Sequence, residues 1–316
     1  MTPVRFVMIA AAWLAGASSV WAQFGGQEAK PTAGPVLGAE RTQRWRIGMT
    51  VTAQTPCFII FGTIPVPTQW PEQDVKVVEE QIGDSIQRVD YRDLSGGIRQ
   101  MVVIVPQLNP GEKTEAIVTL EVTRRAMAPP ANPDDLRLPE KTPRDARKYL
   151  APSPQIDCRN RKVRDLAQEI TADKEPAWQK VEALHGWVRE NIKTTNDKLK
   201  GTLATLESKS GRMDDLAGLF VAMCRSLKIP ARMVWVPDYS YAEFYLEDAA
   251  GEGYWFPCEL GEKSVFGALG NQYMILQKGD NIEVPELKEP QRFVTEFVKG
   301  KGRPQVSFVR QVMGAQ

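Results

Sequence analysis

The stretch that decides the fold reads Gly211-Arg212-Met213-Asp214-Asp215-Leu216-Ala217-Gly218-Leu219-Phe220, and it leads on to Ile229-Pro230-Ala231-Arg232. Its apolar residues recur every three or four positions, which is the period of an amphipathic helix starting at Met213 or Asp214. The two aspartates favour the positively polarised start of this helix. Because Pro230 cannot continue a helix, the apolar run after it predicts a strand. The sequence therefore predicts a glycine turn, an amphipathic helix to Leu227 and a strand.

Further helical and strand-like segments surround this stretch. Helical spacing occurs in 163–170 and 178–192, and strand candidates cover 232–236, 242–246 and 254–258. Helices followed by strands within one segment are typical of an α+β fold. We expect this α+β domain to span residues 158–290.

The part of the chain before this domain is rich in short β-type runs. They are Ile47–Ala53, Phe58–Ile64, Val75–Glu79, Ile86–Tyr91, Ile98–Val105 and Ala116–Val122. Turn residues separate them, a pattern that predicts an antiparallel β-sandwich over residues 45–126. Residues 127–157 are rich in proline and are expected to form a linker, and residues 291–316 a C-terminal extension.

Residues 1–22 have the features of a secretory signal: Arg5, the apolar run Phe6–Leu14 and a small residue, Ala22. We expect residues 23–44 to follow as a flexible leader. An uncleaved anchor stays open, as does the choice among periplasm, cell surface and medium.

The charges are balanced, with 40 Lys and Arg against 39 Asp and Glu, so nothing indicates a nucleic-acid-binding surface. Export permits disulfides, but the spacing of the four cysteines, Cys57, Cys158, Cys224 and Cys258, determines no pairing. Their spacing matches no metal-binding motif, and no cofactor is expected.

A set of residues in 178–260 follows a known pattern. They are Gly211, Asp214, Asp215, Leu219, Phe220, Arg225, Ile229, Pro230, Ala231, Arg232, Glu243 and Tyr245, with the upstream segment Trp187–Ile192. This pattern resembles the transglutaminase-like superfamily, which has a papain-like core. The segments 255–258 and 275–281 are similar to a secreted bacterial subgroup with an N-terminal β domain. The resemblance implies that the family's cysteine falls on Met213, its histidine on Tyr239 and its acidic residue on Glu259.

These replacements remove the family's chemistry. A thioether has no proton to lose, and a phenol with an ordinary pKa of about 10 is a poor base near neutrality. The one histidine, His185, lies mid-helix on an apolar face, where we expect it to pack rather than to carry protons. Cys224 is expected to be a buried free thiol and Cys258 a core or disulfide cysteine.

We therefore expect a catalytically inactive, exported pseudoenzyme that binds a peptide, a protein or a cell-envelope component. Trp235, Tyr241 and Trp255 are the candidate residues that line its cleft. We expect Glu243 to pair with an arginine such as Arg232. Two alternatives stay open: an active transglutaminase- or protease-like enzyme with a non-standard nucleophile, and a structural assembly protein.

Overall fold

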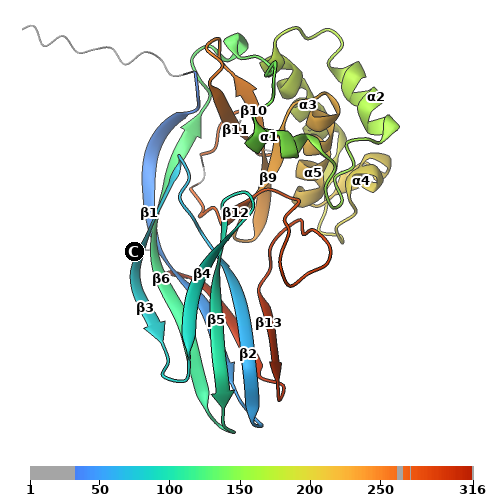
Figure 1. Ribbon diagram of the computed structural model, residues 1–316. Helices are drawn as coiled ribbons and strands as arrows, with labels where there is room; N and C mark the ends of the chain where they lie inside the picture. The colour runs from blue at the N-terminus through green and yellow to red at the C-terminus, as the bar shows by residue number, and fades with distance from the viewer. Residues whose placement is uncertain (1–32, 262–265, 271, 315–316) are drawn as a thin grey trace, which may run out of the picture. The chain divides into compact units, whose positions relative to one another are not determined.

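The computed structural model describes residues 33–261, 266–270 and 272–314 (Figure 1). The expected signal segment, residues 1–22, lies outside these ranges. Within them, none of the helices combines the length and the apolar character needed to cross a bilayer.

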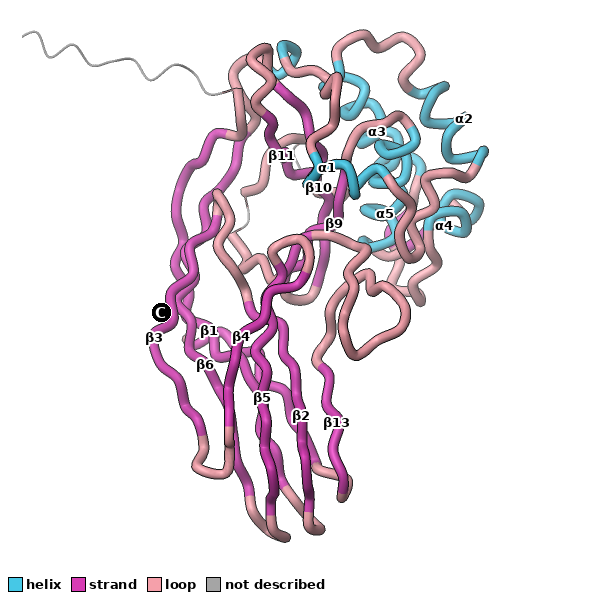
Figure 2. The backbone as a smooth tube through the Cα atoms, in the orientation of Figure 1, coloured by secondary structure: helices cyan, strands magenta, loops and turns pink. Residues whose placement is uncertain are grey.

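Eight strands form two four-stranded antiparallel sheets. They are β1 (Val36–Thr52), β2 (Cys57–Val66), β3 (Gln73–Ile82), β4 (Arg88–Leu94), β5 (Ile98–Leu108), β6 (Lys113–Ala128), β13 (Phe297–Lys301) and β14 (Gln305–Met313). One sheet has the order β14-β1-β6-β3. The other has the order β13-β2-β5-β4 (Figure 2). Alternate residues such as Ile47, Met49, Ile64, Val103 and Val118 point between the sheets and form one apolar core. The β-sandwich expected from the sequence is present.

Two parts of this sandwich differ from the boundaries expected from sequence. β1 begins at Val36, so residues 36–44 are strand and not a flexible leader. Their side chains are mostly exposed, but their backbone pairs with β6, as in Val36 with Ala128. The expected C-terminal extension supplies β13 and β14, which pair with β2 and β1. Backbone pairing with distant strands stabilises both segments, and no local pattern reveals it.

Along the chain, the α+β domain lies between β6 and β13. Its main helices are α2 (Arg161–Ile170), α3 (Ala177–Asn191), α4 (Thr202–Ser208) and α5 (Met213–Ser226). Its main sheet has the order β11-β10-β9-β12, from β9 (Ala231–Val236), β10 (Tyr239–Glu247), β11 (Gly253–Cys258) and β12 (Gln277–Lys278). The short strands β7 (Lys193–Thr194) and β8 (Ser210–Gly211) pair in parallel. The segment expected to be a linker, residues 127–157, holds the end of β6 and isolated β-bridges such as Arg137 with Glu247. Its other elements are the short helical turns η1 (Pro133–Asp135), α1 (Arg144–Arg147) and η2 (Lys148–Leu150).

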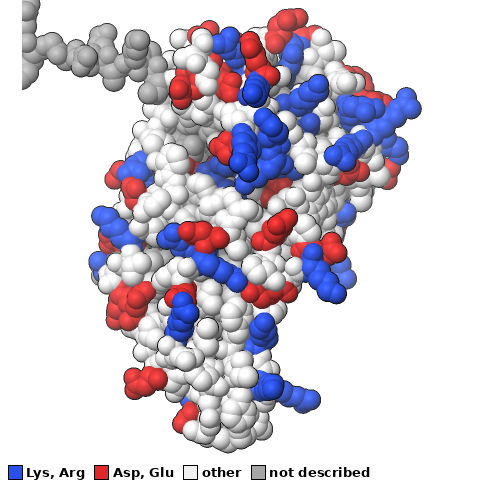
Figure 3. Space-filling view, viewed as in Figure 1, with Lys and Arg blue, Asp and Glu red and all other residues white. Residues whose placement is uncertain are grey.

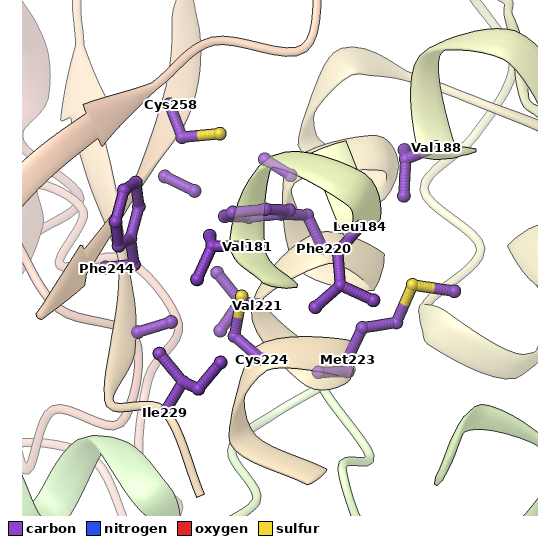
Figure 4. Close-up of a cluster of buried hydrophobic side chains, with 14 of the residues drawn as sticks. Val181, Leu184, Val188, Phe220, Val221, Met223, Cys224, Ile229, Phe244 and Cys258 are labelled. Carbon is purple, nitrogen blue, oxygen red and sulfur yellow. The ribbon is translucent and has the colours of Figure 1, made fainter. Parts of the chain in front are cut away.

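The apolar core of this domain lies between α5 and one face of the sheet. Phe220 and Cys224 of α5 pack in one cluster with Val181 of α3, Phe244 of β10 and Cys258 of β11 (Figure 4). Because successive side chains of a strand alternate between faces, the residues beside Phe244 on β10 point away from the helices. The sheet therefore presents two different faces, one to the helices and one to the opposite side.

Charged side chains of both signs are spread over the face of the molecule in Figure 3. This distribution agrees with the formal net charge of +1.

Candidate functional site

The turn before α5 fixes the position of Met213. A Cβ atom on Gly211 would lie only 2.7 Å from Cβ of Asp215, so the turn requires glycine here. The buried Asp215 carboxylate accepts hydrogen bonds from the backbone N–H of Arg212 at 3.0 Å and of Lys200 and Gly201 at 2.9 Å each. Asp215 thus satisfies donors of the turn and stabilises the helix start. Met213 is the first residue of α5, as the spacing predicted.

Asp214 connects the start of α5 to the start of β10. Its Oδ1 accepts a hydrogen bond from Ser240 Oγ at 2.7 Å, and its backbone oxygen accepts one from Arg292 Nη2 at 2.5 Å. Ser240 follows directly after Tyr239. The hydrogen bond between Asp214 and Ser240 therefore joins α5 to β10. Met213 and Tyr239, which take the positions of the family's cysteine and histidine, each precede one partner of this bond.

Tyr239 and Glu259 form a pair. The Tyr239 hydroxyl donates a hydrogen bond to Oε1 of Glu259 at 2.8 Å. Both side chains are partly exposed. The family resemblance implies an imidazole at residue 239 that is held by a carboxylate at residue 259. In this chain the phenol of Tyr239 takes the position of the imidazole.

Met213 lies beside the chain segment that carries Glu259. Its Cε is 3.9 Å from the position that a Cβ on Gly261 would take, and its Sδ is 3.9 Å from the Thr194 hydroxyl. The structure therefore brings the three positions Met213, Tyr239 and Glu259 into one region, from three separate elements.

His185 is close to this region but is part of the core. It is 3% exposed, and its Nε2 donates a hydrogen bond to the backbone oxygen of Glu259 at 2.7 Å. Its ring packs against Phe220 and Phe266. Burial lowers its pKa, since the charged imidazolium loses its hydration, although the bond to Glu259 opposes this. The predicted packing role of the only histidine is confirmed.

The four cysteines are buried and carry free thiols. Burial raises the pKa of Cys158, of Cys224 and of Cys258. A raised pKa keeps a thiol protonated and therefore poorly nucleophilic. The expectation of a buried free thiol at Cys224 is confirmed, and Cys258 is a core cysteine.

Two of the three aromatic residues expected to line a cleft are in the interior. Trp235 is 9% exposed, and its Nε1 donates to the Gly279 backbone oxygen at 2.8 Å. Tyr241 is 1% exposed and packs in a separate apolar cluster with Met127 and Ile275. Both lie on strands whose two faces are covered, so neither lines the cavities described below.

Trp255 does line a cavity, of about 460 Å³, on the sheet face that points away from the helices. The Arg232 guanidinium lies 3.9 Å from the centre of one of its rings. Arg232 also pairs with Glu243 at 2.7 Å, as the sequence predicted. The same carboxylate binds Lys278 Nζ at 2.6 Å, and Lys278 binds Glu72 at 2.6 Å. This buried network is distinct from the surroundings of Met213.

A different cavity, of about 510 Å³, lies beside Met213. Its lining residues are Gly186, Arg189, Glu190, Asn191, Ile192, Lys193, Thr194, Lys209, Leu216 and Leu260. Thr194 belongs to this lining and also contacts the Met213 sulfur. No local pattern assigned these residues to a cavity, since the charged character of the segment after α3 was the only signal. In the described parts of the chain, no group of three or more His, Cys, Asp or Glu side chains is arranged to hold a metal ion.

Comparisons with known proteins agree with this architecture. The family model of the transglutaminase-like superfamily matches residues 164–260, which include α5, β9, β10 and β11. No curated protein matches the chain. Among solved structures, a candidate cysteine protease from Cytophaga hutchinsonii is similar, with 15% sequence identity and a TM-score of 0.53 over 89% of this chain and 94% of that chain. At this identity the likeness concerns the fold alone.

Two other solved structures are less similar. A candidate protease from Parabacteroides distasonis has 12% identity and a TM-score of 0.29, over 69% of this chain and 43% of its own. The periplasmic domain of TgpA from Pseudomonas aeruginosa has 16% identity and a TM-score of 0.35, over 72% of this chain and 88% of its own. The family match shows that residues 164–260, with α5 and its sheet, form a domain of the transglutaminase-like superfamily.

Proposed function

We propose that this protein is an exported pseudoenzyme whose transglutaminase-like domain binds a ligand, such as a peptide, without converting it. The observation that carries the proposal is the hydrogen bond of 2.8 Å between the Tyr239 hydroxyl and Glu259, next to a helix that begins with Met213.

The chemistry of cysteine-type acyl transfer supports this reading. The reaction needs a thiolate that attacks a carbonyl carbon and an imidazole that takes a proton and returns it. The Met213 sulfur carries a methyl group and has no proton to release. The Tyr239 hydroxyl donates its hydrogen to the Glu259 carboxylate, and a neutral phenol is a far weaker base than an imidazole.

The other nucleophiles and bases of the domain are poor substitutes. Cys224 and Cys258 lie in the apolar core, and burial raises the pKa of both thiols. His185 donates its Nε2 hydrogen to a backbone oxygen and is almost fully buried. A substrate could reach these groups only if the core opened.

Binding remains available to the domain. The cavity beside Met213 has a volume of about 510 Å³, within the range of about 300–1,000 Å³ that is common for ligand sites. It combines buried leucines with polar and charged side chains, as such sites usually do. The signal-like residues 1–22 support the proposal of export.

The test is an activity assay on the purified mature protein with a panel of peptide amides and an amine acceptor. We expect no turnover and no covalent intermediate, as measured by mass spectrometry of the intact protein. A covalent acyl adduct on any side chain, or turnover that a thiol-alkylating reagent abolishes, would contradict the proposal.

A restoration experiment provides the positive arm. The double variant Met213→Cys with Tyr239→His places a thiol at the helix start and an imidazole beside Glu259. We expect this variant to react with iodoacetamide at residue 213 faster than the single variant Met213→Cys, because an imidazole can accept the thiol proton. Equal rates in the two variants would show that residue 239 is not placed to act on residue 213.

A further inference from the structure

The cavity beside Met213 has an unequal distribution of charge. Three cationic residues line it, Arg189, Lys193 and Lys209, against one acidic residue, Glu190. The whole chain, in contrast, has nearly equal numbers of basic and acidic residues. Positive charge is therefore concentrated at this cavity.

The fold places two of these cations close together. β7 and β8 pair in parallel, and the backbone N–H of Lys193 donates to the backbone oxygen of Lys209 at 2.9 Å. The two lysines are 16 positions apart in the sequence and become neighbours only through this pairing. Both lysines therefore contribute to the cavity lining from adjacent places in the backbone.

The two lysines at the cavity differ from other lysines nearby in their partners. In the ranges that the structure describes, neither Lys193 nor Lys209 forms an ion pair. Other lysines nearby do: Lys162 binds Glu207 at 2.5 Å and Lys200 lies 3.6 Å from Asp197. An unneutralised pair of cations at the rim of a cavity favours an anionic ligand.

The remaining lining residues add an apolar surface. Ile192, Leu216 and Leu260 are almost completely buried, yet they contribute to the wall of the cavity. Asn191 and Thr194 supply hydrogen-bonding groups between this apolar surface and the lysines. A ligand that matches the cavity has an apolar part and, a few bonds away, an anionic group.

We propose that this cavity recognises a carboxylate-bearing peptide, whose carboxylate binds between Lys193 and Lys209 while an apolar side chain contacts Leu216 and Leu260. This inference rests on the proposed binding function and specifies its ligand class. The carboxylate belongs either to an acidic side chain or to the C-terminus of the peptide. Both sources present the same planar anion to the lysines.

The experiment measures fluorescence anisotropy with four labelled hexapeptides that share one apolar core. The first has a glutamate and an amidated C-terminus, and the second has a glutamine and a free C-terminus. The third has a glutamine and an amidated C-terminus, and the fourth has a lysine and an amidated C-terminus. We expect the first or the second to bind about 10-fold more tightly than the third, and the fourth to bind most weakly.

The double variant Lys193→Gln with Lys209→Gln should remove this preference, so that carboxylate and neutral peptides bind alike. Replacement of the same two residues by arginine should retain the preference, since the charge is kept. The matched control is Lys113→Gln with Lys141→Gln, which changes two exposed lysines outside the cavity and should leave binding unchanged. All four lysines are exposed, so thermal unfolding of every variant should match that of the unmodified protein.

The outcomes separate the two proposals. The third, neutral peptide could bind as tightly as the carboxylate peptides, and equally well to the variant Lys193→Gln with Lys209→Gln. This result would refute the carboxylate assignment and leave the proposed binding function intact. Absence of binding by all four peptides would also refute the assignment. Turnover of any peptide by the unmodified protein would instead refute the pseudoenzyme proposal.

Discussion

Replacement of Glu243 by glutamine tests how the structure holds its central sheet. Glu243 has no solvent exposure, and its carboxylate lies between two cations. Oε2 binds Arg232 at 2.7 Å and Oε1 binds Lys278 at 2.6 Å. Burial alone would raise the pKa of Glu243, but the two cations outweigh it and the pKa is lowered. The side chain is therefore ionised in the folded protein.

The expected loss of stability follows from these contacts. Glutamine keeps the shape of the glutamate side chain but removes its negative charge. Its amide NH₂ also points hydrogens at Arg232 or Lys278, which can only donate. Removal of one partner of a buried ion pair typically costs about 3–5 kcal/mol. Lys278 keeps its bond to Glu72, and Arg232 keeps its contact with the ring of Trp255. We therefore expect the lower end, about 3 kcal/mol.

Chemical denaturation and thermal unfolding measure this loss. With an unfolding entropy of about 2.1 cal/mol/K per residue, about 3 kcal/mol corresponds to a decrease in Tm of roughly 5 °C for a chain of this size. The matched control is Asp165→Asn, which removes an exposed pair with Arg161 at 3.1 Å and should cost less than about 1 kcal/mol. The double variant Arg232→Gln with Glu243→Gln should lose less than the sum of the two single variants, because both act on one interaction.

Equal stability of Glu243→Gln and Asp165→Asn would show that the Glu243 carboxylate does not stabilise the sheet through Arg232 and Lys278. The same conclusion would follow from strict additivity in the double variant. Either result would mean that water or another group neutralises the cations when Glu243 is replaced.

Three further predictions concern the histidine, the cysteines and the pair of Tyr239 with Glu259. Burial lowers the pKa of His185 in the folded protein, so its imidazole binds a proton more tightly in the unfolded chain. The neutral His185 therefore contributes stability above the unfolded pKa of about 6.5. This contribution is lost as the pH falls toward the lower pKa of the folded protein. His185→Gln should flatten the dependence of Tm on pH between pH 7 and 5, and an unchanged slope would contradict this. Iodoacetamide should modify none of the four buried cysteines in the native protein and all four after denaturation, and rapid native labelling counted by mass spectrometry would show an accessible thiol. Tyr239→Phe should cost about 1–2 kcal/mol of unfolding free energy, since it removes a hydrogen bond to a carboxylate. Tyr91→Phe, which removes an exposed hydrogen bond to Glu80, should cost less, and the reverse order would argue against the assigned role of the Glu259 contact.

The helix α5 shows what local sequence can predict. Its start at Met213, the glycine turn before it and the strand after Pro230 follow from periodicity and from residues with restricted backbones. Each of these signals lies within a few residues of the feature it determines. The pairing of Glu243 with Arg232 was also predictable, because the two are close in sequence and belong to adjacent strands.

The sandwich shows what local sequence cannot predict. Residues 36–44 carry mostly exposed side chains, and their strand conformation depends on backbone pairing with β6. β14 similarly depends on β1, although more than 250 positions separate Thr52 from its partner Gln305. The energy of such pairing depends on which distant segments meet, and no short window of residues records that.

The absence of a thiol at residue 213 and of an imidazole at residue 239 is a property of the covalent chain, since no fold can supply an atom that the side chains lack. The tertiary structure alone decided that the Tyr239 hydroxyl meets Glu259, that Trp235 and Tyr241 are enclosed, and that Lys193 and Lys209 lie together at one cavity. These relations join residues 16 or more positions apart and depend on burial, which is determined by the packing of whole elements rather than by the identity of neighbouring residues.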